Sequence, residues 1–334
     1  MDEGFAALRA AVDAAGGKVD ANGDDLNVVI GGVGHSVRTI SASMVFPRDA
    51  RQMAWKAISM RSEGVSPVIV AEAVSEGARS FLRSQSIGYA DAGGSLFLPL
   101  PGAYLLIDRA APKREKRVVK GVLSGRTSLA AHVIMAAEEP INGTEVARNS
   151  GLSVGAVSGA MERLDRMGWL ATTGSGPRKL RRVSDRRGLL DQWRSTRLSE
   201  GPVGKSKFYV PGVRDSRELA EKLAAVAARD GVEYALSGPY GAQMHAPYLT
   251  SVPQVVCRIR KTDIPALVAA LGARPAAEGW NLGVIASDLP SNPVFRQELE
   301  GFSVASPLVC WVDTVAEGGR NPELAAHLAE QRLL

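Results

Sequence analysis

The sequence predicts a mixed α/β (α+β) protein of several domains, with a winged helix-turn-helix at its centre. Three observations lead to this prediction. A chain of 334 residues is too long for one ordinary domain. Hydrophobic residues make up 45% of it, which is enough to bury more than one core. Segments with strand and helix periodicity alternate at both ends, whereas the middle is helical, basic and punctuated by glycine.

The central segment begins with three predicted helices. Residues 128–139 form an apolar, alanine-rich run that Pro140 ends, because proline cannot continue a helix. We expect Thr144 to cap a second helix and Gly151 to end it. Ser153 is expected to cap a third helix, whose apolar face packs on the first two. The residues of that face are Val154, Val157, Met161 and Leu164.

A hairpin is predicted after the third helix, which Gly168 closes. Residues 169–173 (WLATT) resemble a strand, residues 174–177 (GSGP) a turn, and residues 178–183 (RKLRRV) the returning strand. Three helices followed by a hairpin are the order of a winged helix. We place this domain at residues 128–198, after a basic linker at residues 111–127.

The third helix would enter the major groove of double-stranded DNA by its N-terminal half. Small residues on its polar face would allow a close approach of the helix backbone, and Arg163 and Ser158 are the best candidates for base contacts. Basic residues of the wing and the linker would meet phosphates. The candidate DNA-binding residues are Thr144, Ser153, Ala156, Ser158, Gly159, Arg163, Arg166, Arg178, Lys179, Arg181 and Arg182, with Lys116 and Arg117 of the linker. The alternative is a small helical domain used for protein contact, with its charges merely solvated.

The distribution of charge supports a polyanionic partner for the middle of the chain only. The net charge is +5, from 40 basic and 35 acidic residues. Between Lys113 and Arg126, six basic residues accompany one acid, and between Arg163 and Arg197, ten accompany three. The remaining sequence is close to neutral or acidic, so the basic residues are concentrated around the predicted winged helix.

Composition predicts no metal site and no cofactor. The two cysteines, Cys257 and Cys310, lie in apolar runs without metal-ligand spacing, and we interpret them as buried free thiols. The four histidines are scattered along the chain. Without a signal peptide or a long uninterrupted apolar run, the chain is expected to be soluble and cytoplasmic, with no membrane partner.

Residues 1–110 are predicted to form a small α/β domain. Its order of elements is shared by nuclease-like folds, whose metal site needs an acid followed by a carboxylate-x-lysine on the next strand. Asp91 is the only well-placed acid, and the next strand at residues 95–98 (SLFL) has neither carboxylate nor lysine. We therefore expect a degenerate nuclease-like domain in which Asp91 bonds to the adjacent glycine turn.

Residues 205–334 are predicted to form a second α/β domain. The strand at 234–237 followed by Ser-Gly and a helix resembles the opening of a nucleotidyltransferase fold, but no pair of acids follows. Instead the next strand carries Arg258 and Arg260, which would face a phosphate-bearing or acidic partner, or solvent. Gly204-Lys205-Ser206 lacks the upstream glycine of a phosphate-binding loop. We predict a final strand at residues 307–313 and a closing helix at 321–331.

Two segments of the C-terminal domain resemble a known family. They read YALSGPYGAQMHAPYL (residues 234–249) and LVCWVDTVAEGGRNPELAAHLAEQRL (residues 308–333). Both are similar to the C-terminal domain of the AbiEi-type transcriptional regulators, the antitoxins of type IV toxin-antitoxin systems. Residues 68–98 resemble an additional domain that some relatives carry before the winged helix. The residues that match the second pattern are Asp313, Gly319, Arg320, Glu323 and Ala325.

The resemblance implies a non-enzymatic protein that represses its own operon by binding operator DNA. It also implies a nucleotidyltransferase-like toxin as a partner, and we consider a homodimer as the DNA-binding form. Here the winged helix is central, whereas the better-known antitoxins begin with it. A stand-alone or ligand-sensing regulator is the main alternative. A further alternative is a metal-dependent enzyme that acts on nucleotides or nucleic acid through Asp91 or Asp313.

Overall fold

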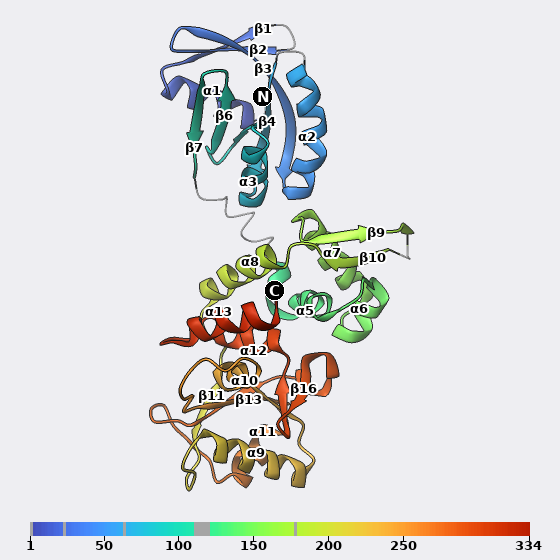
Figure 1. The fold of residues 1–334 in the computed structure, drawn as a ribbon, viewed down its shortest axis with the longest axis vertical. Coiled ribbons are helices and arrows are strands. Elements are labelled where there is room, and N and C mark those ends of the chain that lie inside the picture. Colours follow the sequence, from blue (N-terminus) through green and yellow to red (C-terminus); the bar gives the residue numbers. More distant parts are fainter. Residues whose placement is uncertain (1–2, 23–24, 63–64, 110–120, 177–178) are drawn as a thin grey trace. The chain divides into compact units, whose positions relative to one another are not determined.

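A computed structural model describes residues 3–22, 25–62, 65–109, 121–176 and 179–334 (Figure 1). The described residues are mixed α/β and form three sheets. Backbone packing divides the chain into two compact units. The first comprises Met1–Val122 with Ser158–Thr172, and the second comprises Leu123–Val157 with Thr173–Leu334. The boundary therefore crosses the central segment, inside the third of its predicted helices.

A seven-stranded sheet forms the body of the first unit, with its strands in sequence order. The middle strands β3, β4 and β5 are parallel, and the outer pairs are antiparallel hairpins. The strand predicted at residues 95–98 overlaps β6. The strands are β1 (Lys18–Asn22), β2 (Asp25–Ile30), β3 (Val33–Val45), β4 (Ser66–Val74), β5 (Gly88–Asp91), β6 (Leu96–Leu100) and β7 (Ala103–Ile107).

Helices cover both faces of this sheet (Figure 1). The side chains of β4 alternate between the two faces, and both faces are apolar. Val68 and Val70 belong to the core beneath α1, whereas Ile69 and Ala71 belong to the core beneath α2 and α3. The Ser75 hydroxyl accepts a hydrogen bond from Ala78 N at 3.2 Å and caps α3. The helices are α1 (Glu3–Ala14), α2 (Pro47–Ser62) and α3 (Glu76–Ser84).

The central segment contains three helices and a hairpin in the predicted order. The hairpin strands join a short strand, β8, in a sheet of order β8-β10-β9. Gly151 and Gly168 have positive φ angles of 67° and 78° and end the second and third helices, as predicted. The elements are η1 (Gly125–Thr127), α5 (Ser128–Ala136), β8 (Ile141–Asn142), α6 (Gly143–Ser150), α7 (Val154–Arg166), β9 (Leu170–Thr173), β10 (Leu180–Val183) and α8 (Arg186–Glu200).

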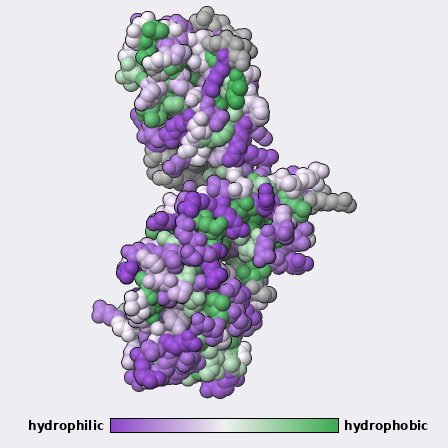
Figure 2. All heavy atoms as spheres, in the orientation of Figure 1, coloured by the Kyte–Doolittle hydropathy of each residue, from purple (hydrophilic) through white to green (hydrophobic). Residues whose placement is uncertain are grey.

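The C-terminal part of the second unit is a mixed seven-stranded sheet of order β14-β11-β15-β13-β12-β17-β16. Helices α9 and α11 cover one face, and α10, α12 and α13 pack together on the other (Figure 1). Hydrophilic residues dominate its visible surface, with small hydrophobic spots between them (Figure 2). The strands are β11 (Ser206–Tyr209), β12 (Tyr234–Ser237), β13 (Val255–Ile259), β14 (Arg274–Pro275), β15 (Leu282–Ala286), β16 (Arg296–Leu299) and β17 (Phe302–Ala305).

The predicted final strand at residues 307–313 is wrong, because this segment is helix α12. Pro307 is its first residue, where the missing N–H has no helical partner to lose. Residues 308–311 are all buried, so the apolar run has no exposed face from which a helical period can be read. The helices here are α9 (Ser216–Asp230), α10 (Gly238–His245), α11 (Ile264–Ala270), η3 (Leu289–Ser291), η4 (Pro293–Phe295), α12 (Pro307–Thr314) and α13 (Asn321–Arg332).

Candidate nucleic-acid interface

The first two turns of α7 expose small side chains. The Ser153 hydroxyl accepts a hydrogen bond from Ala156 N at 3.3 Å, which fixes the start of the helix as predicted. Ala156 and Ser158 are exposed, and Gly159 is half-buried. A Cβ atom added at Gly155 would meet no heavy atom within 4 Å. The backbone is therefore accessible along the part of α7 that was predicted to approach DNA.

The opposite face of α7 is buried, with one exception. Val157, Met161 and Leu164 are each no more than 1% exposed, as predicted. Val154 is 63% exposed, so its placement on this face was wrong. It is the first residue of the helix, and helical side chains tilt toward the N-terminus. Its side chain is therefore directed beyond the N-terminal end of α7.

Two arginines near the C-terminal end of α7 have different surroundings. The Arg163 side chain is half-buried, and its Nε atom is buried with no hydrogen-bond partner in the residues that the structure describes. Arg166 lies within the first unit, where its guanidinium is 3.4 Å from the Asp49 carboxylate and 4.8 Å from the Phe46 ring centre. Asp165 forms a further ion pair with Arg48. Arg166 thus already has protein partners, and the Arg163 Nε atom is too deeply buried to reach DNA.

Thr144 is exposed at the start of α6 but does not cap it. Asn142 is the cap, and its side-chain oxygen accepts a hydrogen bond from Glu145 N at 2.9 Å. The Glu145 carboxylate accepts one from Asn142 N at 3.4 Å in return. This reciprocal capping box starts the helix two residues before Thr144. The prediction overlooked it because asparagine and threonine are both good caps.

Strand β10 separates the basic residues of the predicted wing. Arg182 and Leu180 are exposed, whereas Arg181 is half-buried, and among the described residues its Nε atom has no hydrogen-bond partner. Successive side chains of a strand point to opposite faces, so Arg181 and Arg182 leave β10 on opposite faces. Lys179 is exposed immediately before the strand. Of the other predicted residues, Arg178, Lys116 and Arg117 lie outside the described residues.

Arg258 was predicted to face a partner or solvent, but it is buried in an ion pair with Asp313. Its Nε and Nη2 atoms donate to the two carboxylate oxygens at 2.7 and 2.5 Å. The Ser237 hydroxyl donates to the same carboxylate at 2.6 Å. Burial opposes the charge of Arg258, but the Asp313 carboxylate raises the pKa of Arg258 above its usual value. This cluster links β12, β13 and α12 beside the Ser-Gly turn at residues 237–238.

Asp91 occupies a similar structural role in the first unit. Its carboxylate accepts hydrogen bonds from Ser95 N at 3.0 Å and from Arg79 Nη2 at 2.8 Å. Both side chains are almost fully buried, and the bond to Ser95 N spans the glycine turn as predicted. Within the described parts of the chain, histidine, cysteine and acidic side chains nowhere gather in the groups of three that hold a metal ion.

The cysteines are buried free thiols, as predicted. Burial raises the pKa of Cys257 to about 12. Cys310 lies against α10, where a Cβ atom added at Gly241 would come within 2.8 Å of its sulfur. Of the helices that the structure describes, none has both the length and the apolar character needed to cross a membrane.

Comparisons of this chain with protein-family models, with curated proteins and with solved structures found no match.

One histidine with an unsatisfied atom was missed by the reasoning from sequence. His132 lies on α5, is 6% exposed, and has a buried Nδ1 atom for which the described part of the chain offers no hydrogen-bond partner. A signal was present, because His132 interrupts the otherwise apolar run AAHVIM at residues 130–135. A polar residue in a buried helix requires a partner, whereas spacing rules test only for metal ligands.

Proposed function

We propose that this protein is a transcriptional regulator that binds double-stranded DNA through α7 and β10. The observation that carries the proposal is the exposed start of α7, where Ala156, Ser158 and an unobstructed Gly155 leave the helix backbone accessible. Exposed small residues allow a helix to lie deep in the major groove. The basic residues that follow in sequence supply affinity for phosphates.

The proposed contacts fall into two classes. Ser158 and Arg163 would read base edges from α7, since a hydroxyl and a guanidinium are both suited to hydrogen bonds in the major groove. Lys179 and Arg182, which are exposed on and next to β10, would bind phosphates and add no sequence information. Arg166 contributes instead to the packing of α7, through Asp49 and Phe46.

The resemblance to AbiEi-type regulators extends the proposal. It supports an autorepressing antitoxin of a type IV system, with a nucleotidyltransferase-like toxin as a second partner. It also supports a homodimer on inverted repeats, because paired half-sites are the usual target of paired recognition helices. The buried Arg258–Asp313 ion pair agrees with a C-terminal domain that serves as a scaffold, since both carboxylate oxygens already accept hydrogen bonds.

The test is binding of the purified chain to a labelled duplex from its own upstream region, with a scrambled duplex of equal length as control. The proposal expects the native duplex to bind about a thousandfold more tightly than the scrambled one at physiological salt. It also expects the affinity to fall steeply as salt rises, because counterions are released from phosphates. Equal and weak binding to both duplexes refutes a sequence-specific regulator.

A further inference from the structure

Most edge strands of the two seven-stranded sheets carry residues that oppose pairing with a further strand. Among the described residues, β1, β7, β14 and β16 each have a neighbouring strand on one side only. Charged side chains and proline are the usual means by which proteins protect such an open edge. The protecting residues are all exposed, and they are Lys18 and Asp20 of β1, Arg274 and Pro275 of β14, and Glu298 of β16.

Strand β7 is the exception, because its sequence AYLLI contains neither charge nor proline. It is the outermost strand of its sheet and, in the described part of the chain, pairs with β6 alone (Figure 1). Tyr104 and Leu106 are 70% and 48% exposed and share one face of the strand. Leu105 and Ile107 point to the other face and pack against the core beneath α1. An uncharged, apolar edge of this kind pairs readily with another strand.

Tyr104 and Leu106 also carry the outward-facing backbone groups of this edge. A two-residue turn at residues 101–102 joins Leu100 to its partner Ala103. In an antiparallel hairpin the pair next to such a turn exchanges hydrogen bonds, and every second pair after it does the same. Tyr104 and Leu106 belong to the alternate pairs, so their N–H and C=O groups point away from β6. The edge therefore offers backbone donors and acceptors beside exposed apolar side chains.

We propose that β7 pairs with β7 of a second copy of this chain, antiparallel and about a two-fold axis at Leu105. In this register Tyr104 of each copy lies opposite Leu106 of the other, and such aromatic–aliphatic pairs stabilise sheets. The residues with outward-facing backbone groups then lie opposite each other and exchange hydrogen bonds. The whole of β7 is paired, from Ala103 to Ile107, and the sheets of the two copies become continuous.

The charges around β7 favour a second copy as the occupant of this edge. An antiparallel pair of identical strands is a two-fold interface, in which both copies use the same surface. Asp108 and Arg109 follow β7, and the register places them beside the uncharged turn at residues 101–102 of the other copy. Asp108 also pairs with Arg79 and Arg83 of its own chain, at 3.2 and 2.9 Å. Self-pairing therefore brings no like charges together, whereas like charges directly opposite would oppose it.

The experiment is sedimentation velocity of the full chain, without DNA, at concentrations from about 1 to about 100 μM. We expect a reversible dimer with a Kd of about 10 μM, because one strand pair buries less surface than a standard interface. A chain that stays monomeric over the whole range overturns the proposal.

A lysine on the edge tests whether β7 is the interface. Leu106→Lys should weaken self-association at least about tenfold, because a charged side chain on an edge strand opposes pairing. The matched control is Trp55→Lys, which replaces an apolar residue that is 80% exposed on α2 and should leave the dimer unchanged. Circular dichroism checks that both variants are folded. Equal self-association of the two variants contradicts β7 as the interface.

A pair of double variants tests the register. Tyr104→Lys with Leu106→Glu places each new ammonium group opposite a new carboxylate of the other copy. Tyr104→Lys with Leu106→Lys places like charges opposite each other in the same register. We expect the first double variant to dimerise at least about tenfold more tightly than the second. Equal self-association of the two double variants refutes the proposed register.

The interface stands apart from DNA binding, and separate outcomes test the two. A chain that dimerises but does not bind the upstream duplex keeps the interface and refutes the regulator. A monomeric chain that binds the duplex refutes the interface alone. If the proposed function holds as well, the dimer carries two copies of α7, and Leu106→Lys should weaken duplex binding about a hundredfold relative to Trp55→Lys. Equal duplex binding by these variants refutes a role of the dimer in DNA binding.

Discussion

Arg258 and Asp313 illustrate how single buried charges are satisfied in this protein. Their side chains are 11% and 1% exposed, and the carboxylate accepts three hydrogen bonds. The sequence contained both residues, but they are 55 positions apart and belong to separate elements. Local patterns describe the faces of one element and say nothing about charges that meet across a fold. The pairing was therefore not predictable from the chain alone.

We predict that Asp313→Asn lowers the free energy of unfolding by about 3–5 kcal/mol, because it leaves the buried Arg258 guanidinium without a counter-charge. The double variant Arg258→Met with Asp313→Leu should lose much less, since it removes both charges and keeps the volume. Urea denaturation measures both. A single variant as stable as the wild-type chain would show that this ion pair is not buried in solution.

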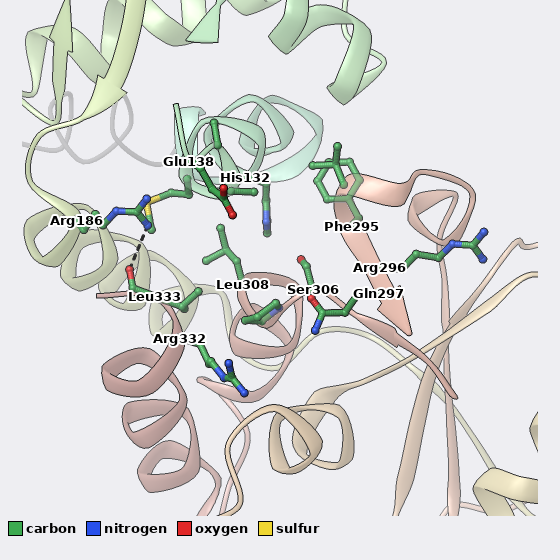
Figure 3. Close-up of a pocket in the computed structure, with 15 residues that line it drawn as sticks. His132, Glu138, Arg186, Phe295, Arg296, Gln297, Ser306, Leu308, Arg332 and Leu333 are labelled. Atoms are coloured by element: carbon green, nitrogen blue, oxygen red, sulfur yellow. Dashed lines mark hydrogen bonds between the residues drawn. The ribbon is translucent and has the colours of Figure 1, made fainter. Parts of the chain in front are cut away.

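His132 predicts a pH dependence of stability. Its pKa is lowered in the folded protein to about 3 from 6.5, through burial and the nearby Arg258, against the opposing effect of Asp313. Arg186, Arg332 and Glu138 line a cavity of about 550 Å³ beside His132 (Figure 3). The unfolded chain therefore binds more protons between these two values, and stability falls as the pH drops through this window. At pH 5 the loss from His132 amounts to about 2 kcal/mol.

The measurement compares the free energy of unfolding at pH 7 and pH 5 for wild type and His132→Phe. We expect the acid-induced loss to be about 2 kcal/mol smaller in the variant, because phenylalanine does not titrate. His327→Gln is the control, since His327 remains partly accessible beside Tyr248. An equal acid-induced loss of unfolding free energy in all three proteins would show that His132 is in contact with water.

At the scale of elements, the sequence predicted most helices and strands and missed those that depend on tertiary context. Helix α7 was found with its cap, Ser153, and helices α6 and α7 with the glycines that end them, Gly151 and Gly168, because periodicity and capping are local. Strands β16 and β17 were missed, although Glu300 and Gly301 form a left-handed turn between them. Helix α12 was mistaken for a strand because burial on all sides removes its period.

The candidate interface was predicted less completely than the fold. The exposed small residues of α7 were correctly placed, since one helical face follows from spacing. The basic residues of the wing were predicted to act together on phosphates. In the structure successive side chains of β10 point to opposite faces, so Arg181 and Arg182 are separated. The cavity at His132 could not be predicted, because its walls come from segments up to 201 positions apart, from His132 to Leu333.

Strand β10 gives a prediction about salt dependence. Replacing the exposed pair Lys179 and Arg182 by alanine should weaken DNA binding and reduce the slope of log K against log salt by about two, if each binds one phosphate. The control is Arg214→Ala with Arg217→Ala, which removes two charges from exposed ion pairs on and before α9. Filter binding across a salt series measures both slopes. If the two double variants behave alike, β10 does not contact DNA.

At the scale of the whole molecule, the two units are linked through the central segment. Helix α7 crosses the boundary between them, because Ser158–Thr172 packs with the first unit and Leu123–Val157 with the second. Helix α8 follows the hairpin, and its Trp193 contacts His132 in the second unit. The proposed DNA-binding helix therefore contains residues of both units.

The most direct test of the account is the binding of operator DNA by Ala156→Glu, with Ala156→Gln as the control of equal size. Ala156 is exposed in the first turn of α7, where a carboxylate suits the helix dipole and should not reduce stability. In the major groove the same carboxylate would face phosphates and base acceptors. We predict that Ala156→Glu loses at least about 2 kcal/mol of binding free energy relative to Ala156→Gln, with both variants fully folded. Equal binding by the two variants would show that α7 does not enter the groove.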